Sequence, residues 1–237
     1  DPRKNIQRLL AAFAALPAAV RSAHQLVLAG GMNRPQRVAL DQQIRDAGLT
    51  GDQVIVTGRV TDADFSGLYG LCRAHILPTY CEGFGLTALE AMACGAVVIG
   101  SNYSSVPEVI GNPEALFDPF SVAAIAQKIE QALCDEAFRA RLLAYSQEQL
   151  GRFSWAQTAQ RALDALEALD AQGVFAAQAL QGLDAALCIQ QAGRVGGFEQ
   201  QRRVSRVAEH DDAARGVAVE PGTRCGEQSV MTVGWLL

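Results

Sequence analysis

The segment of the chain best suited to chemistry is a glycine-rich turn that directly precedes an expected helix, in the sequence CEGFGLTALEAMACG. It follows HILP, an apolar stretch typical of a short strand. The first N–H groups of a helix have no partners within the helix, and the helix dipole places about half a positive charge there. We therefore expect a diphosphate to bind the backbone amides of residues 83–87, where the glycines allow the ligand to approach the backbone closely.

Two acidic residues, Glu82 and Glu90, flank this turn with seven residues between them. Glu90 lies three and four residues beyond Thr87 and Leu86, so a helix places it one turn behind them on the same side. We therefore expect Glu90 to face the edge of a pocket. Paired carboxylates also suggest glycoside hydrolysis, but that reaction needs them on opposite sides of one bond, about 5 to 10 Å apart. A loop residue and a helix residue on one side of a turn fit that arrangement poorly.

The elements around the turn alternate between amphipathic helices and short apolar strands, which is typical of βαβ units on a parallel sheet. Strands are expected at residues 25–29, 53–57, 75–77, 96–100 and 115–117. Helices are expected at residues 5–15, 34–47, 62–72, 86–93, 122–133, 136–150 and 154–169. The predicted fold class is therefore α/β, with a doubly wound, Rossmann-like parallel sheet. Ligands of such sheets bind beyond the carboxyl ends of the strands, so the segments LAGG, TGRV and LPTYCEGFG should line one crevice.

Four segments resemble, in order, those of the retaining glycosyltransferases of GT-B fold, group 1 or family 4. The pair of glutamates with seven residues between them resembles the family's signature. DPRKNIQRLLAAFA resembles the opening helix, VTGRVTDADFSGLY the loop beside the base, and GSNYSSVPEVIGNPEALFDPFS the segment after the signature. The last segment is most similar to bacterial transferases that build lipopolysaccharide and O-antigen sugars, often from GDP-mannose.

The resemblance implies that residues 1–170 are a nucleotide-sugar-binding domain, the C-terminal half of a GT-B enzyme. It implies two catalytic residues, Lys4 at the donor diphosphate and Glu82 at the transferred sugar, and it places Glu90 at the ribose hydroxyls. The other implied donor contacts are Gly83 in the turn, the amides of Phe84 and Gly85 at the sugar, Leu86 and Thr87 at the phosphates, and Arg59 and Val60 at the base. These roles agree with chemistry, because carboxylates accept from hydroxyls and a lysine point charge suits a diphosphate.

The implied function is transfer of a sugar from a nucleotide diphosphate sugar to a saccharide or lipid-linked acceptor, with retention of anomeric configuration. No cofactor and no metal are expected. Asp62 and Asp64 imitate a D-x-D metal motif, but Thr61 followed three residues later by Asp64 predicts a helix cap. The alternative function is a non-catalytic nucleotide-sugar-binding or interaction module.

The resemblance also predicts what this chain should lack. Family members begin this domain with a strand that ends in Gly-Arg, and an N-terminal domain that binds the acceptor precedes it. The sequence as given begins after that strand, so we expect the first strand and the N-terminal GT-B domain to be missing. Such a fragment would bind donor without full activity, and the N-terminal domain would be its partner.

The composition excludes several other classes of protein. The net charge is −5 and the 18 Arg and two Lys are scattered, so nucleic acid is not an expected partner. The apolar stretches fall short of the roughly 18 to 20 residues that span a bilayer, and the N-terminus is unlike a signal peptide. We therefore expect a soluble, cytoplasmic protein, and the resemblance admits peripheral association of the parent protein with the inner face of the membrane. The six cysteines lack CxxC spacing, so no zinc or redox site is indicated.

Residues 171–237 show no consistent apolar face, and no fold can be assigned to them. Disorder, an unrelated appended segment and a small docking element all stay open. Because this tail lacks the periodicity needed to offset its ordering entropy, a cut at about Ala171 is expected to leave the domain as stable as the full chain.

Overall fold

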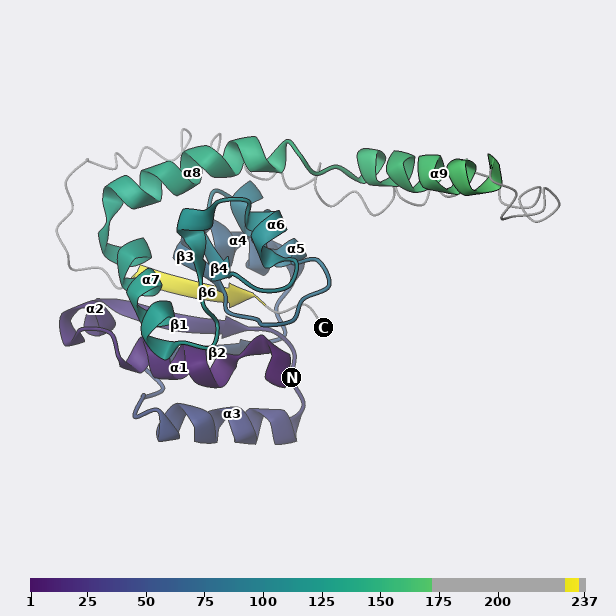
Figure 1. Cartoon of the computed structure of the whole chain (residues 1–237). Helices are drawn as coiled ribbons and strands as arrows, with labels where there is room; N and C mark the ends of the chain where they lie inside the picture. Colours follow the sequence, from purple (N-terminus) through teal and green to yellow (C-terminus); the bar gives the residue numbers. More distant parts are fainter. Residues whose placement is uncertain (172–228, 235–237) are drawn as a thin grey trace, which may run out of the picture.

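The computed structural model describes residues 1–171 and 229–234, which form an α/β fold around one six-stranded sheet (Figure 1). The strands are β1 (His24–Ala29), β2 (Val54–Gly58), β3 (Cys72–Leu77), β4 (Val98–Ser101), β5 (Leu116–Phe117) and β6 (Ser229–Gly234). Their order across the sheet is β2-β1-β6-β3-β4-β5, and every neighbouring pair is parallel.

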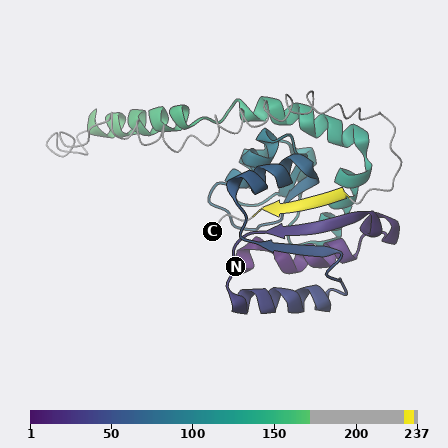
Figure 2. The ribbon, with the colours of Figure 1, turned by 180° about the vertical axis from the view of Figure 1, so that it is seen from behind.

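The described α-helices are α1 (Ile6–Ala14), α2 (Ala18–Ala23), α3 (Arg34–Asp46), α4 (Asp62–Leu71), α5 (Leu86–Ala93), α6 (Val106–Ile110), α7 (Val122–Cys134), α8 (Glu136–Leu150) and α9 (Trp155–Ala171), with 3-10 turns η1 (Pro2–Lys4) and η2 (Pro113–Ala115). Helix α1 packs against α3 and α7, while α4, α5, α6 and α8 pack together on the other side of the sheet (Figures 1 and 2). The predicted doubly wound parallel fold is confirmed. Helices α2 and α6 were not predicted, because each is too short to show a helical period.

Local sequence explains where most of the helices begin. Asn33, Thr61, Ser121 and Asp135 cap α3, α4, α7 and α8, each by accepting a hydrogen bond from a backbone amide of the first turn. Helix α5 differs, because it begins at Gly85 without a side-chain cap. The φ of Gly85 is 98°, which a residue with a side chain rarely adopts. Within the described part of the chain, no side chain therefore accepts hydrogen bonds from the first amides of α5.

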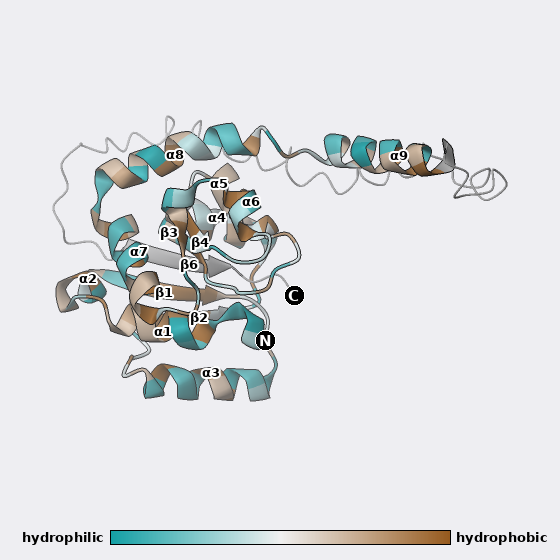
Figure 3. Cartoon of the chain, viewed as in Figure 1, coloured by the Kyte–Doolittle hydropathy of each residue, from teal (hydrophilic) through white to brown (hydrophobic). Residues whose placement is uncertain are grey.

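The core lies between the sheet and its two helical layers. Leu9, Leu10 and Phe13 bury one side of α1, and Ile76 and Ile99 are fully buried in β3 and β4. Figure 3 shows apolar strands enclosed by helices with hydrophilic outer faces, α3 most clearly. Helix α9 extends away from this body (Figures 1 and 2).

Strand β6 is the main departure from the sequence-based expectation. It pairs with β1 over six residues, from His24 opposite Ser229 to Ala29 opposite Gly234, and with β3 on its other side. Six residues of the segment without an assigned fold therefore occupy the centre of the sheet, and a cut at Ala171 would remove them. Residues 172–228 and 235–237 of the predicted tail lie outside the described residues. The strand could not be predicted because its pairing partners are about 150 to 200 positions away along the chain.

Candidate functional site

The loops after β1, β2 and β3 lie at one edge of the parallel sheet, as predicted. The amide of Gly30 donates to the carbonyl of Gly58 at 3.0 Å, which joins the loop after β1 to the end of β2. The loop after β3 continues through residues 78–85 into α5. These loops bring together side chains that are distant in sequence.

Lys4 and Glu82, the two predicted catalytic residues, are in direct contact. Lys4 Nζ lies 3.1 Å from Glu82 Oε2, and the two side chains are only 21% and 22% exposed. Lys4 ends the η1 turn and Glu82 lies in the loop after β3. A partly buried amine and carboxylate at the end of a parallel sheet can bind different parts of one ligand. The amine suits anionic groups, and the carboxylate accepts hydrogen bonds from hydroxyl groups.

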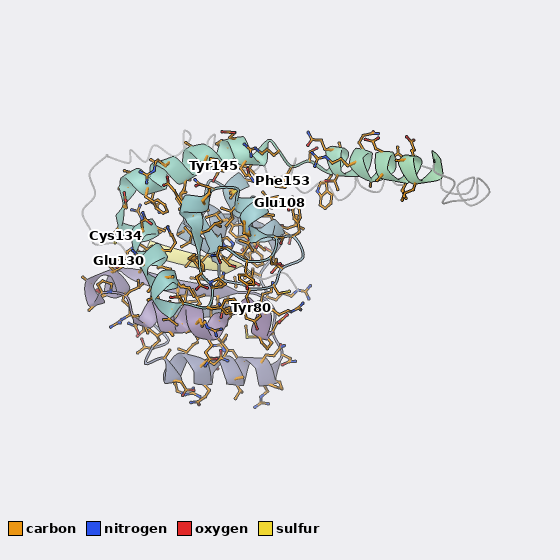
Figure 4. The ribbon with its side chains drawn as sticks, in the orientation of Figure 1. Tyr80, Glu108, Glu130, Cys134, Tyr145 and Phe153 are labelled. Atoms are coloured by element: carbon orange, nitrogen blue, oxygen red, sulfur yellow. The ribbon has the colours of Figure 1, made fainter. Side chains whose placement is uncertain are left out.

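Asn5 holds this pair in place, and the sequence-based reasoning missed it. Asn5 is 4% exposed and adopts a left-handed conformation with a φ of 58°. Its Nδ2 donates to the carbonyls of Pro78 at 3.0 Å and Pro119 at 2.7 Å. The amide of Tyr80, labelled in Figure 4, donates to the carbonyl of Arg3 at 3.2 Å. The backbone around Lys4 is thus attached to the loop that carries Glu82, and the one signal in the sequence is an Asn directly before a helix, a residue type that tolerates φ > 0.

The glycine turn, where the sequence predicts an anion site, is only partly exposed. Gly83, Phe84 and Leu86 are exposed, whereas Gly85 and Thr87 are buried. The ring of Phe84 meets that of Phe153 edge-on at 5.7 Å (Phe153 is labelled in Figure 4). Lys4 contacts Glu82 at the beginning of the Glu82–Gly85 loop, and α5 starts at its end, after Gly85. A lysine charge and the amides of a helix start are both suited to a phosphate group.

Glu90 is half-buried on α5 and faces α4. The hydroxyl of Tyr69 donates to Glu90 Oε2 at 3.5 Å, the long end of the hydrogen-bond range. Burial raises the pKa of Glu90, the Tyr69 hydroxyl lowers it, and the charge of Asp62 raises it. Tyr69 is itself buried, and burial, followed by the charge of Glu90, raises its pKa. A half-buried carboxylate with this partner can also accept hydrogen bonds from a ligand.

Arg59 and Val60 lie at the edge of an open hollow of about 610 Å³, together with Thr61, Asp62 and Asp64. Helix α4 begins at Asp62, on the edge of this hollow, and packs against α5, the helix that carries Glu90. The structure brings Lys4 and Glu82 into contact and places Arg59 and Val60 together at the hollow, whereas Glu90 contacts Tyr69 and does not line the hollow.

Asp64 caps a helix, as predicted. Its carboxylate accepts hydrogen bonds from the hydroxyl and the amide of Thr61 at 2.8 and 3.1 Å, and the amide of Asp64 donates to the Thr61 hydroxyl. The Thr61 hydroxyl lowers the pKa of Asp64. Within residues 1–171 and 229–234, no three His, Cys, Asp or Glu side chains gather in a way that could hold a metal ion. No helix in the same part of the chain is long and apolar enough to span a membrane.

Comparison with known proteins shows which family the sequence resembles. Residues 1–149 match the family described as glycosyl transferases group 1. The serotype-specific mannosyltransferase WbdA of Escherichia coli is 43% identical over 164 residues, which cover 69% of this chain and 20% of that protein. The O-antigen chain mannosyltransferase B of Escherichia coli is 36% identical over 169 residues, 71% of this chain and 44% of that protein.

A solved structure shows the same fold. Sucrose-phosphate synthase from Thermosynechococcus elongatus matches with a TM-score of 0.62 at 30% identity, over 73% of this chain and 44% of that one. The predicted likeness to GT-B glycosyltransferases is thereby confirmed. The chain spans less than half the length of each of these relatives. With the family match covering well over half of its residues, the chain belongs to the group 1 glycosyl transferases.

Proposed function

We propose that this chain binds a nucleotide diphosphate sugar, and that the parent protein transfers the sugar to a saccharide or lipid-linked acceptor with retention of configuration. The contact between Lys4 and Glu82 beside the uncapped start of α5 carries this proposal. The likeness to two mannosyltransferases favours mannose as the sugar and GDP-mannose as the donor. Both relatives are longer than this chain, so the acceptor and the complete reaction concern the parent protein.

The residues divide the donor between them. The amine of Lys4 and the first amides of α5, at Leu86 and Thr87, bind the diphosphate and stabilise the charge that develops on it as the bond to the sugar breaks. Glu82 and the amides of Phe84 and Gly85 bind the sugar hydroxyls. The leaving diphosphate accepts the proton of the acceptor, so the reaction needs no nucleophile from the enzyme.

The nucleoside half binds at Arg59, Val60 and Glu90. Glu90 accepts from the ribose hydroxyls, and the backbone of Arg59 and Val60 binds the base at the hollow beside α4. The raised pKa of Glu90 fits this role, because a desolvated carboxylate gains more from two hydroxyl donors than a solvated one does. The positive charge of Lys4 and the α5 amides replaces a divalent metal in this scheme.

Helix α9 offers a surface for the N-terminal domain that we propose as a partner within the parent protein. Its side chains Trp155, Leu163, Leu166 and Leu169 are all exposed, although they are apolar. A row of apolar residues along a helix that extends from the body is typical of an interaction surface. The alternative, a module that binds nucleotide sugars without catalysis, predicts the same donor contacts but no transfer when the N-terminal domain is present.

A binding screen tests the proposal directly. GDP-, UDP- and ADP-sugars would be titrated into the full 237-residue chain by calorimetry. We expect one donor to bind and Lys4→Met to weaken it by about tenfold or more, since a charge-assisted contact contributes about 1.5 to 3 kcal/mol. Lys128 is the other lysine of the chain and lies on α7, so Lys128→Met is the matched control. No binding of any donor, or equal losses in both variants, would refute the proposed role of Lys4.

A further inference from the structure

The turn after β4 binds the glycine turn through two serine hydroxyls. Ser104 Oγ donates to the carbonyl of Glu82 at 2.7 Å and accepts from the amide of Glu82 at 3.1 Å. Ser105 Oγ lies 3.0 Å from the carbonyl of Glu82 and 2.9 Å from that of Phe84. The two hydroxyls therefore hold the peptide groups before Gly83 and the one after Phe84. A Cβ added at Gly83 would meet no atom within 4 Å, so the packing around this residue does not hold the turn.

The serines are themselves held firmly. Ser104 has a φ of 59°, and in the described part of the chain only Asn5 shares such a left-handed conformation among residues other than glycine. A residue persists in this region when its surroundings over-determine its conformation. The hydroxyl of the fully buried Ser101 accepts from the amide of Tyr103 at 2.9 Å, which anchors the turn to β4. Ser105 follows directly and begins α6.

We propose that Ser104 and Ser105 are positioning residues for the sugar half of the donor. They orient the backbone between Glu82 and Phe84, so the Glu82 carboxylate and the amides that follow it face the transferred sugar. The nucleoside half depends on other elements, namely α5 and the loop before α4. The inference rests on the proposed function and deepens it, because it predicts that the two halves of the donor can be weakened separately.

Four variants of the full chain test this inference. Ser105→Ala removes one hydroxyl, and Ser105→Thr retains it. Ser104→Gly removes the other hydroxyl while favouring φ > 0, and Ser104→Asn retains hydrogen-bonding groups in a residue that tolerates this conformation. Calorimetry would measure the Kd of GDP and of GDP-mannose for each variant, with UDP and UDP-glucose as a second pair of probes. Thermal melts establish that each variant is folded, and Ser105→Ala carries the test should Ser104→Gly not fold.

We expect Ser105→Ala and Ser104→Gly to leave the Kd of the nucleoside diphosphate within about twofold and to weaken the sugar nucleotide by about three- to tenfold, the usual effect of one lost hydrogen bond. Ser105→Thr should bind both like the wild type. Equal weakening of both ligands would show a general structural role and overturn the inference, as would no change in either. Wild-type protein that binds neither pair would instead refute the proposed function itself.

Discussion

Replacing Glu90 should separate the stability of the domain from its ability to bind nucleotide. Burial is the largest influence on the pKa of Glu90 and raises it above the ordinary value of 4.5. A carboxyl group whose pKa is raised by folding contributes stability that is fully present below about pH 4.5 and is lost as the pH rises through the folded value. Above its folded pKa the charged carboxylate therefore destabilises the ligand-free fold relative to a neutral side chain of the same shape.

The cost to binding follows from the hydrogen bonds that Glu90 is proposed to make. Two ribose hydroxyls would donate to its carboxylate, and a hydrogen bond to a charged group contributes about 1.5 to 3 kcal/mol. Since Glu90 is only half-buried, water can replace part of the hydrogen bonding that the variant loses. We therefore expect Glu90→Ala to weaken nucleotide binding by about 1 to 3 kcal/mol, or about 5- to 150-fold in Kd. Glu90→Gln keeps a neutral acceptor, so its loss should be smaller.

The assay combines calorimetry with the nucleoside diphosphate and thermal melts at pH 4 and pH 7.5. Glu90→Gln should melt at or above the wild-type temperature at pH 7.5, and this advantage should shrink at pH 4. The matched control is Glu130→Gln, because Glu130 is exposed on α7 and lies apart from the site (labelled in Figure 4). An unchanged Kd in folded Glu90→Ala would remove Glu90 from the site. The difference in melting temperature between Glu90→Gln and wild type would be compared at the two pH values. A smaller gain at pH 7.5 than at pH 4 would refute the burial argument.

Three further predictions concern the support of the site by Asn5, the role of strand β6 and the metal dependence of donor binding. Asn5→Ala leaves two buried carbonyls without their donor and should lower the free energy of unfolding by about 1 to 3 kcal/mol in denaturant titrations, a loss that Asn5→Gly should not recover. Truncation after Ala171 removes β6 and leaves the backbone groups of β1 and β3 that pair with it without partners. The melting temperature should therefore fall by several degrees, or the domain should not fold. An unchanged melting temperature would mean that the sheet closes without β6. Donor binding should be unaffected by excess chelator, and a loss that magnesium or manganese restores would identify Asp62 and Asp64 as metal ligands.

Local sequence determined the parts of this protein that depend on neighbouring residues. Thr61 and Asp64 predicted a helix cap because a capping box needs only residues three apart, and the structure contains it. The glycine turn and the apolar stretch after it predicted a helix over residues 86–93 for the same reason, and α5 has these bounds. The alternation of apolar runs with amphipathic helices was sufficient for the doubly wound α/β class, because each period reflects which side of an element is buried.

Tertiary structure decided which distant residues touch. Resemblance assigned Lys4 and Glu82 to the same donor, but their contact joins positions 78 residues apart and depends on how η1 packs against the loop after β3. The serines that hold the glycine turn come from the next crossover of the sheet, and no period in the sequence connects them to Glu82. Strand β6 is the clearest case, because six residues of modest apolar character become a central strand only when β1 and β3 already present unpaired backbone groups on either side. The neighbours of a strand in a parallel sheet are distant along the chain. The residues of the strand alone therefore do not indicate which strands it pairs with.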